Sequence, residues 1–172
     1  MEVKLPLIKP SQAWTGVKVF CTTRSGGLGQ APYDTLNLGL GAGDEPEVVL
    51  ANRAILRQNV PGEPFWLKQV HGVQVADADD QSLSEGAGSP PEVDAAVTSV
   101  PGRVLAILTA DCLPVVIADQ QGTVLGAAHA GWRGLAGGVL ESCLSAMRQK
   151  VPTASGWRAW ITWRTASPMC SR

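Results

Sequence analysis

Short apolar runs, separated by turn-forming and polar residues, constrain the fold of this chain more than any other feature of its sequence. Runs of this length and composition are typical of buried strands. Two earlier segments are rich in β-branched and aromatic residues, and the second is interrupted at Gly72. The predicted strands are Val17–Thr23, Phe65–His71 with Val73–Val75, Val93–Val97, Val104–Leu108, Leu113–Ala118 and Val124–Ala128.

Two longer segments carry apolar residues at helical spacing. Glu45–Gln58 follows Asp44 and has Pro46 in its first turn, which is typical of a helix start. Leu135–Lys150 has one apolar side, and Pro152 would stop it. Strands in succession with helices at intervals predict an α+β or mixed-sheet α/β domain.

The composition excludes several classes of protein. The chain has 172 residues, of which 45% are hydrophobic, enough for one domain with a core. Lys and Arg total 14 against 15 Asp and Glu, so no positive field attracts nucleic acid or anionic lipid. The N-terminus lacks an export signal, and no apolar run is long enough to span a membrane. We therefore predict a cytoplasmic protein without nucleic-acid or membrane partners.

The only two histidines, His71 and His129, lie at the ends of predicted strands and near glycines. Strand ends hold side chains rigidly, and glycine allows a ligand to approach closely. Between them, Cys112 follows Asp111 where an apolar run is interrupted. Two imidazoles and one thiolate would supply three ligands for Zn²⁺ and leave its fourth position open, as in catalytic zinc sites.

Other interpretations of these three residues stay open, because their spacing matches no compact ligand motif. Each histidine would then be a hydrogen-bonded, partly buried side chain and Cys112 an inert core thiol. Alternatively, a histidine lowers the pKa of Cys112 and the thiolate acts as a nucleophile.

Several polar residues stand beside these positions. Arg133, between Trp132 and Gly134, would present a guanidinium fork to phosphate or a purine edge, or would be a solvated residue. The same two interpretations, a phosphate- or purine-binding residue and a solvated one, apply to Arg24. Asp94 and Asp111 would accept hydrogen bonds from imidazoles or cap backbone N–H groups.

Taken together, these motifs resemble the laccase-domain family, whose bacterial YfiH-type members have been labelled multicopper polyphenol oxidases. The resemblance covers about residues 17 to 160. The two most specific motifs are Thr109–Val115 and Ala127–Gly134. The others are Phe20–Gly27, Leu36–Gly39, Gly43–Asp44, Asn52–Arg53, Trp66–Gly72 and Asp94–Ala95.

The resemblance implies an α+β fold with a mixed-sheet β-sandwich core flanked by helices, of the cytotoxic-necrotizing-factor/YfiH type. It implies that His71, Cys112 and His129 are the metal ligands and catalytic residues, with Zn²⁺ expected and copper left open. It also implies a purine nucleoside phosphorylase, which splits adenosine, inosine or guanosine with phosphate, and in some members an adenosine deaminase. The implied substrate-binding residues are Arg24, Asn37, Gln69 and Arg133.

Two other activities are associated with the family. A polyphenol oxidase needs several copper centres, for which two histidines are too few. A Cys-His or zinc hydrolase that edits peptidoglycan precursors would use the same pocket. Purine nucleosides and phosphate are the expected partners, and homo-oligomerisation is left open.

The sequence departs from the family pattern after Trp160, where the expected glycine-proline-rich stretch does not follow. We therefore predict an incomplete laccase-like domain over residues 1–160 and an aberrant tail over 161–172, arising from truncation or a frame shift. An inactive fragment that only binds a nucleoside or a partner chain is the remaining alternative.

Overall fold

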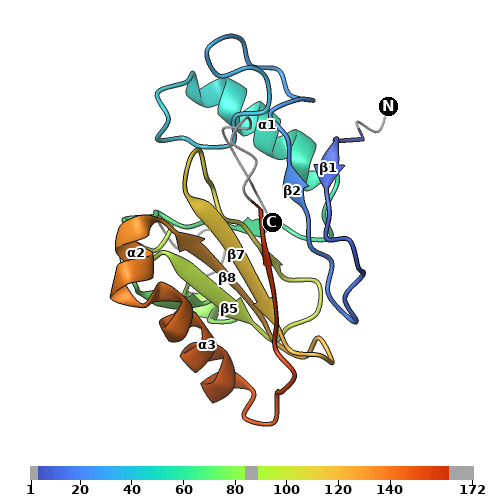
Figure 1. Cartoon of the computed structure of the whole chain (residues 1–172). Coiled ribbons are helices and arrows are strands. Elements are labelled where there is room, and N and C mark those ends of the chain that lie inside the picture. Colours follow the sequence, from blue (N-terminus) through green and yellow to red (C-terminus); the bar gives the residue numbers. More distant parts are fainter. Residues whose placement is uncertain (1–3, 84–88, 163–172) are drawn as a thin grey trace.

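A computed structural model describes residues 4–83 and 89–162 of the chain. Its centre is a five-stranded sheet of order β4-β5-β8-β7-β9, with helix α3 lying along one face (Figure 1). The strands β5, β8, β7 and β9 pair antiparallel, whereas β4 runs parallel to β5, so the sheet is mixed. The bounds are β4 Val75–Asp77, β5 Ala95–Thr98, β7 Leu113–Ala118, β8 Leu125–Ala130 and β9 Arg158–Ile161.

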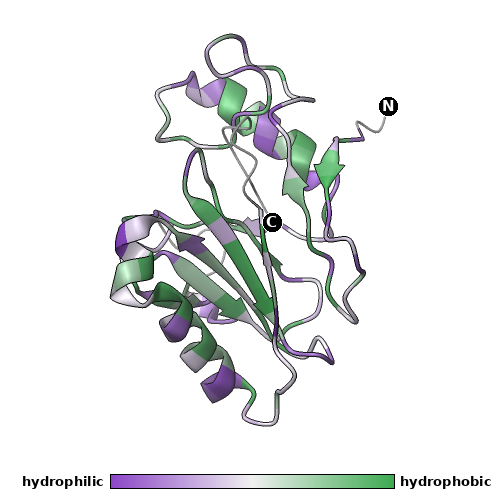
Figure 2. Ribbon diagram, viewed as in Figure 1, coloured by the Kyte–Doolittle hydropathy of each residue, from purple (hydrophilic) through white to green (hydrophobic). Residues whose placement is uncertain are grey.

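Helix α3 (Val139–Lys150) covers the sheet because a glycine in β8 leaves room for it. A Cβ atom on Gly126 would lie 2.6 Å from Met147 Sδ and 2.7 Å from Cys143 Sγ. Met147 and Cys143 are fully buried, and the outward side of the helix is hydrophilic (Figure 2). Helix and sheet thus form the larger of the apolar layers.

The opposite face of the sheet is covered by a second, smaller layer. Strands β3 (Pro64–Phe65) and β6 (Val104–Leu105) pair in parallel. Their apolar residues pack with those of the large sheet that point away from α3, among them Ala96 and Ala127. This layering forms the sandwich core expected from the resemblance.

An N-terminal layer packs α1 (Pro46–Arg57) with the hairpin of β1 (Leu7–Ile8) and β2 (Cys21–Thr22) (Figure 1). The fully buried Asn52 of α1 fixes the preceding loop, since its amide donates to the carbonyl oxygens of Thr35 and Asn37 and accepts from Leu28 N–H. A 3₁₀ turn, η1, spans Gln81–Leu83.

The predicted α+β class with a mixed sheet is confirmed, and one predicted helix is divided in two. The helix expected over Leu135–Lys150 consists of α2 (Trp132–Gly137) and α3, which are separated at Gly138, whose φ is +93°. The expected strands Val17–Thr23 and Phe65–His71 are shorter in the structure. Within them, only Cys21–Thr22 and Phe65 pair with a neighbouring strand. Residues 163–172 of the predicted tail lie outside the described residues. No helix in the described ranges has the length and apolar character to cross a bilayer.

Candidate metal centre

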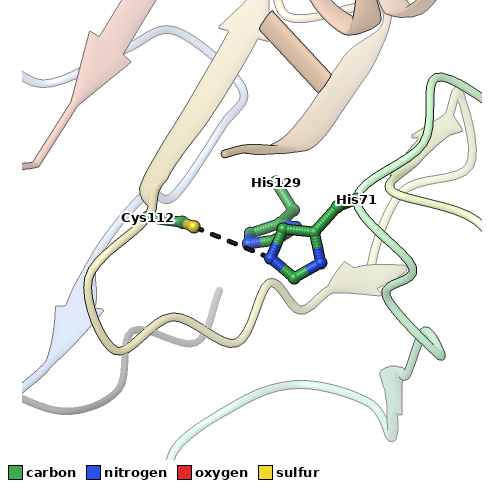
Figure 3. Close-up of side chains that lie close together, drawn as sticks. All are labelled: His71, Cys112 and His129. Carbon is green, nitrogen blue, oxygen red and sulfur yellow. Dashed lines mark hydrogen bonds between the residues drawn. The ribbon is translucent and has the colours of Figure 1, made fainter. Parts of the chain in front are cut away.

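Three side chains from distant parts of the sequence meet at one end of the sheet. His71 lies in the connection between β3 and β4, Cys112 directly precedes β7, and His129 belongs to β8. Their three ligand atoms lie within 4.8 Å of one another, and His71 Nε2 is 3.9 Å from Cys112 Sγ (Figure 3). The two imidazole rings meet edge to face with centroids 4.8 Å apart.

The β-sheet register explains the meeting of Cys112 and His129. Leu113 pairs with Ala130, and Pro114 pairs with His129, so Cys112, immediately before β7, lies near the end of β8. His129 is buried, Cys112 is half-buried and His71 is exposed. The centre therefore opens to solvent on the side of His71.

A buried carboxylate, Asp94, connects the two histidines. Its Oδ1 is 2.8 Å from His129 Nδ1 and also accepts from the His71 backbone N–H at 2.9 Å. Burial by itself would raise the pKa of Asp94, but hydrogen bonds from His129 and from the backbone N–H groups of residues 70–72 outweigh it, so the pKa lies below its ordinary value. The ionised carboxylate only accepts hydrogen bonds, so a neutral His129 ring paired with it carries its proton on Nδ1 and has the Nε2 lone pair available for a metal.

Two backbone features shape the cluster. His71 has a φ of +62°, a left-handed conformation that is uncommon for a residue other than glycine. Gly131 borders all three side chains, since a Cβ atom there would lie 3.0 Å from Cys112 Sγ, 3.1 Å from His71 Cδ2 and 3.7 Å from His129 Cε1. Because Gly131 has no side chain, the three side chains can lie this close to its backbone; the approach of a ligand stays a prediction.

The environment of Cys112 does not activate a free thiol. Burial, followed by the negative charge and hydrogen bonding of Asp111, raises the pKa of Cys112 above its ordinary value. Activated cysteine nucleophiles have lowered pKa values and lie in electropositive surroundings. A bound cation would reverse this balance by stabilising the thiolate.

The polar residues predicted to bind substrate differ in their surroundings. Arg133 is exposed on α2, with its guanidinium 4.9 Å from the ring centre of the exposed Trp132. Arg24 pairs with Asp34 at 3.1 Å. The other two bond within the protein: Asn37 to Asp44 and Gly39, and Gln69 to both backbone groups of Leu108. Substrate contact stays a prediction for all four.

The sequence of the chain matches a known protein family. The sequence profile of the family described as multi-copper polyphenol oxidoreductase laccase matches residues 18–164. The chain belongs to this family. The laccase-domain relationship predicted from the sequence is thereby confirmed.

Within the laccase family, a purine nucleoside phosphorylase of Pseudomonas aeruginosa is 46% identical over 131 residues, which cover 76% of this chain and 51% of that protein. The purine nucleoside phosphorylase YfiH of Escherichia coli is 42% identical and covers 83% of this chain and 57% of that protein. A crystal structure of a Neisseria meningitidis protein superposes with a TM-score of 0.74 at 42% identity, over 89% of this chain and 58% of that one. The chain thus spans about half the length of the curated relatives it matches.

The donor set of this laccase-family chain fits one tetrahedral zinc ion. Bonds of about 2.0–2.3 Å put neighbouring ligand atoms roughly 3.3–3.7 Å apart. The 3.9 Å between His71 Nε2 and Cys112 Sγ is close to this range. The other ligand-atom separations are at most 4.8 Å, and small side-chain rotations would shorten them to the same range. The sequence left two roles open for Asp94, as an acceptor from an imidazole or from backbone N–H groups, and the structure shows both, toward His129 and toward residues 70–72. Which backbone segment the carboxylate contacts leaves no signal in the sequence.

Proposed function

We propose that this chain is a zinc-dependent purine nucleoside phosphorylase whose metal is held by His71, Cys112 and His129. The observation that carries the proposal is the meeting of these three ligand atoms within 4.8 Å, with an open side at His71. Three protein ligands with one free position are typical of catalytic zinc. The purine nucleoside phosphorylases among the relatives support the choice of reaction.

In phosphorolysis a phosphate oxygen bonds to C1′ of the ribose while the C1′–N9 bond breaks, and the products are the free base and ribose 1-phosphate. When bound, zinc would supply a Lewis acid that positions phosphate or lowers the pKa of a water. The protein holds the His129 ring through Asp94, so the ring presents Nε2 to the site. Gly131 keeps the space between the three ligands clear of side-chain atoms.

The proposed substrate contacts come from arginine and amide side chains. Arg133 is exposed on the turn of helix that follows Gly131, and its guanidinium would neutralise phosphate. Arg24, Asn37 and Gln69 complete the proposed set through the family resemblance. Purine nucleosides and phosphate are the proposed partners, and the cytoplasm is the proposed compartment.

Zinc fits the site better than a copper oxidase centre. A coupled copper cluster needs more histidines than the two in this chain. Among the described residues, one group offers three or more ligand atoms of the kinds that bind metals, and it is this one. We therefore propose one zinc ion.

The test is metal analysis of the 172-residue chain combined with a nucleoside assay. We expect about one zinc per chain, and release of free base from inosine or adenosine that requires phosphate. Inosine formed from adenosine without phosphate would report the proposed deaminase activity. His71→Ala and Cys112→Ala should lose both zinc and turnover. A zinc-loaded chain that releases no base would overturn the proposal, as would turnover that survives a chelator, which favours a thiol hydrolase.

A further inference from the structure

Both oxygens of the buried Asp94 carboxylate are occupied by hydrogen bonds from two segments of the site. Oδ1 accepts from the His71 backbone N–H and faces His129 Nδ1. Oδ2 accepts from the backbone N–H groups of Val70 at 3.1 Å and Gly72 at 2.7 Å. The side chain has no exposed surface, so water does not compete for these bonds.

We propose that Asp94 is a positioning residue that sets the geometry of both histidine ligands at once, an inference that rests on the proposed metal site. It acts on His129 through the ring and on His71 through the backbone. A single oxygen, Oδ1, contacts both histidines, so the position of one ligand is tied to that of the other.

The effect on His129 concerns its tautomer. In the neutral ring, a carboxylate at 2.8 Å from Nδ1 favours the tautomer with the proton on that nitrogen, which leaves the Nε2 lone pair for a metal. The backbone adds a second restraint, because His129 N–H donates to the Asp94 carbonyl oxygen at 2.7 Å where β8 pairs with the start of β5.

The effect on His71 concerns its backbone. Residues 70–72 direct three successive N–H groups at one carboxylate, and the middle residue has a φ of +62°. Three hydrogen bonds to a charged acceptor offset the cost of the left-handed conformation. Asparagine at position 94 would offer one oxygen and would turn its N–H₂ group toward backbone donors, so neither orientation of the amide satisfies all four bonds.

The experiment compares Asp94→Asn with a matched control, Asp119→Asn. Asp119 is also a buried aspartate that accepts backbone N–H bonds, from Thr123 and Val124, but it lies at the turn between β7 and β8. Both variants should lower the melting temperature. Asp94→Asn alone should weaken zinc binding, measured by competition with a chelator, by about 10- to 100-fold.

The metal-free protein provides an independent measurement. With only two histidines in the chain, ¹⁵N spectra of the imidazoles are readily assigned with a His71→Ala variant. At a pH at which the imidazoles are neutral, we expect His129 to carry its proton on Nδ1 in the wild type and in Asp119→Asn, and to lose this preference in Asp94→Asn. An Nε2-protonated His129 in the wild type, or equal zinc affinities for both variants, would overturn the inference. Failure of the wild type to bind zinc would instead overturn the proposed function.

Discussion

The backbone of Gly131 lies directly against the side chain of Cys112, with 3.0 Å between the position a Cβ atom would take and the Cys112 sulfur. The backbone of Gly131 is extended, with φ −65° and ψ 159°, a conformation open to any residue. The requirement for glycine here is therefore steric and concerns the site rather than the chain conformation.

Gly131→Ala should consequently damage the proposed metal site while leaving the fold in place. The added methyl group would press on Cys112 and His71 and shift their ligand atoms away from His129, which it would only touch at van der Waals distance. We expect zinc affinity to fall by about tenfold, at the low end of the effects seen next to metal ligands. Competition with a chelating dye measures it.

Gly41→Ala is the control, because a Cβ atom there meets nothing within 4 Å. It should leave zinc affinity unchanged. Equal affinities for the two variants would show that the site can absorb a methyl group, which contradicts the steric argument.

The convergence of the site could be predicted from the sequence only through family resemblance. His71, Cys112 and His129 are separated by tens of residues, and spacing alone left a core histidine or a nucleophile pair open. What joins them is the pairing of β7 with β8 and the contact of the Asp94 carboxylate with residues 70–72. Strand register and backbone hydrogen bonds of a loop have no periodic pattern to reveal them.

The bounds of an element were predicted best from local composition where its residues are buried and apolar. The six-residue strand Leu113–Ala118 has the bounds expected from its apolar run, and it is the central partner of β8 and β9. The break at Gly138 was missed, although Gly137 and Gly138 form a dipeptide typical of turns, because the apolar spacing from Leu135 to Met147 suggested one continuous helix. Here its positive φ ends α2 and starts α3.

Variants of Cys112 and Cys143 allow the effect of metal binding on stability to be measured apart from the effect of core packing. Zinc that binds only the folded state at about 100 times its dissociation constant stabilises by about 2.7 kcal/mol and should raise the melting temperature by roughly 5–10 °C. Cys112→Ala should abolish this rise. Cys143→Ala should keep it, although the loss of a buried side chain against Gly126 should cost about 1–2 kcal/mol. Calorimetry with and without zinc checks both; a rise in Cys112→Ala would argue for a different ligand.

Asp119 gives the fold a predictable acid sensitivity. Burial would raise its pKa, but hydrogen bonds from Val124, Thr123 and Gln121 outweigh it, so the folded pKa lies below the unfolded value. An acid of this kind stabilises the fold above its unfolded pKa, about 3.9, and the contribution is lost as the pH falls through the folded pKa. Asp119→Asn should therefore cost about 1–3 kcal/mol at pH 7 and progressively less below pH 4. Urea denaturation from pH 7 to pH 3 measures this, with the exposed Glu141→Gln as control; a constant difference across the range would contradict it.

Arg133 provides the most direct test of the proposed substrate side, because the chain contains a structural counterpart. Arg133 and Arg148 both place a guanidinium over a tryptophan ring, at 4.9 Å from Trp132 and 5.9 Å from Trp157, but only Arg133 follows the metal centre in α2. Removing a charged hydrogen bond to phosphate costs about 1.5–3 kcal/mol, so Arg133→Gln should raise the KM for phosphate by roughly 10- to 100-fold without loss of zinc. Arg148→Gln should change neither quantity. An unchanged phosphate KM in Arg133→Gln would place phosphate elsewhere, whereas loss of zinc would show that Arg133 supports the metal site instead.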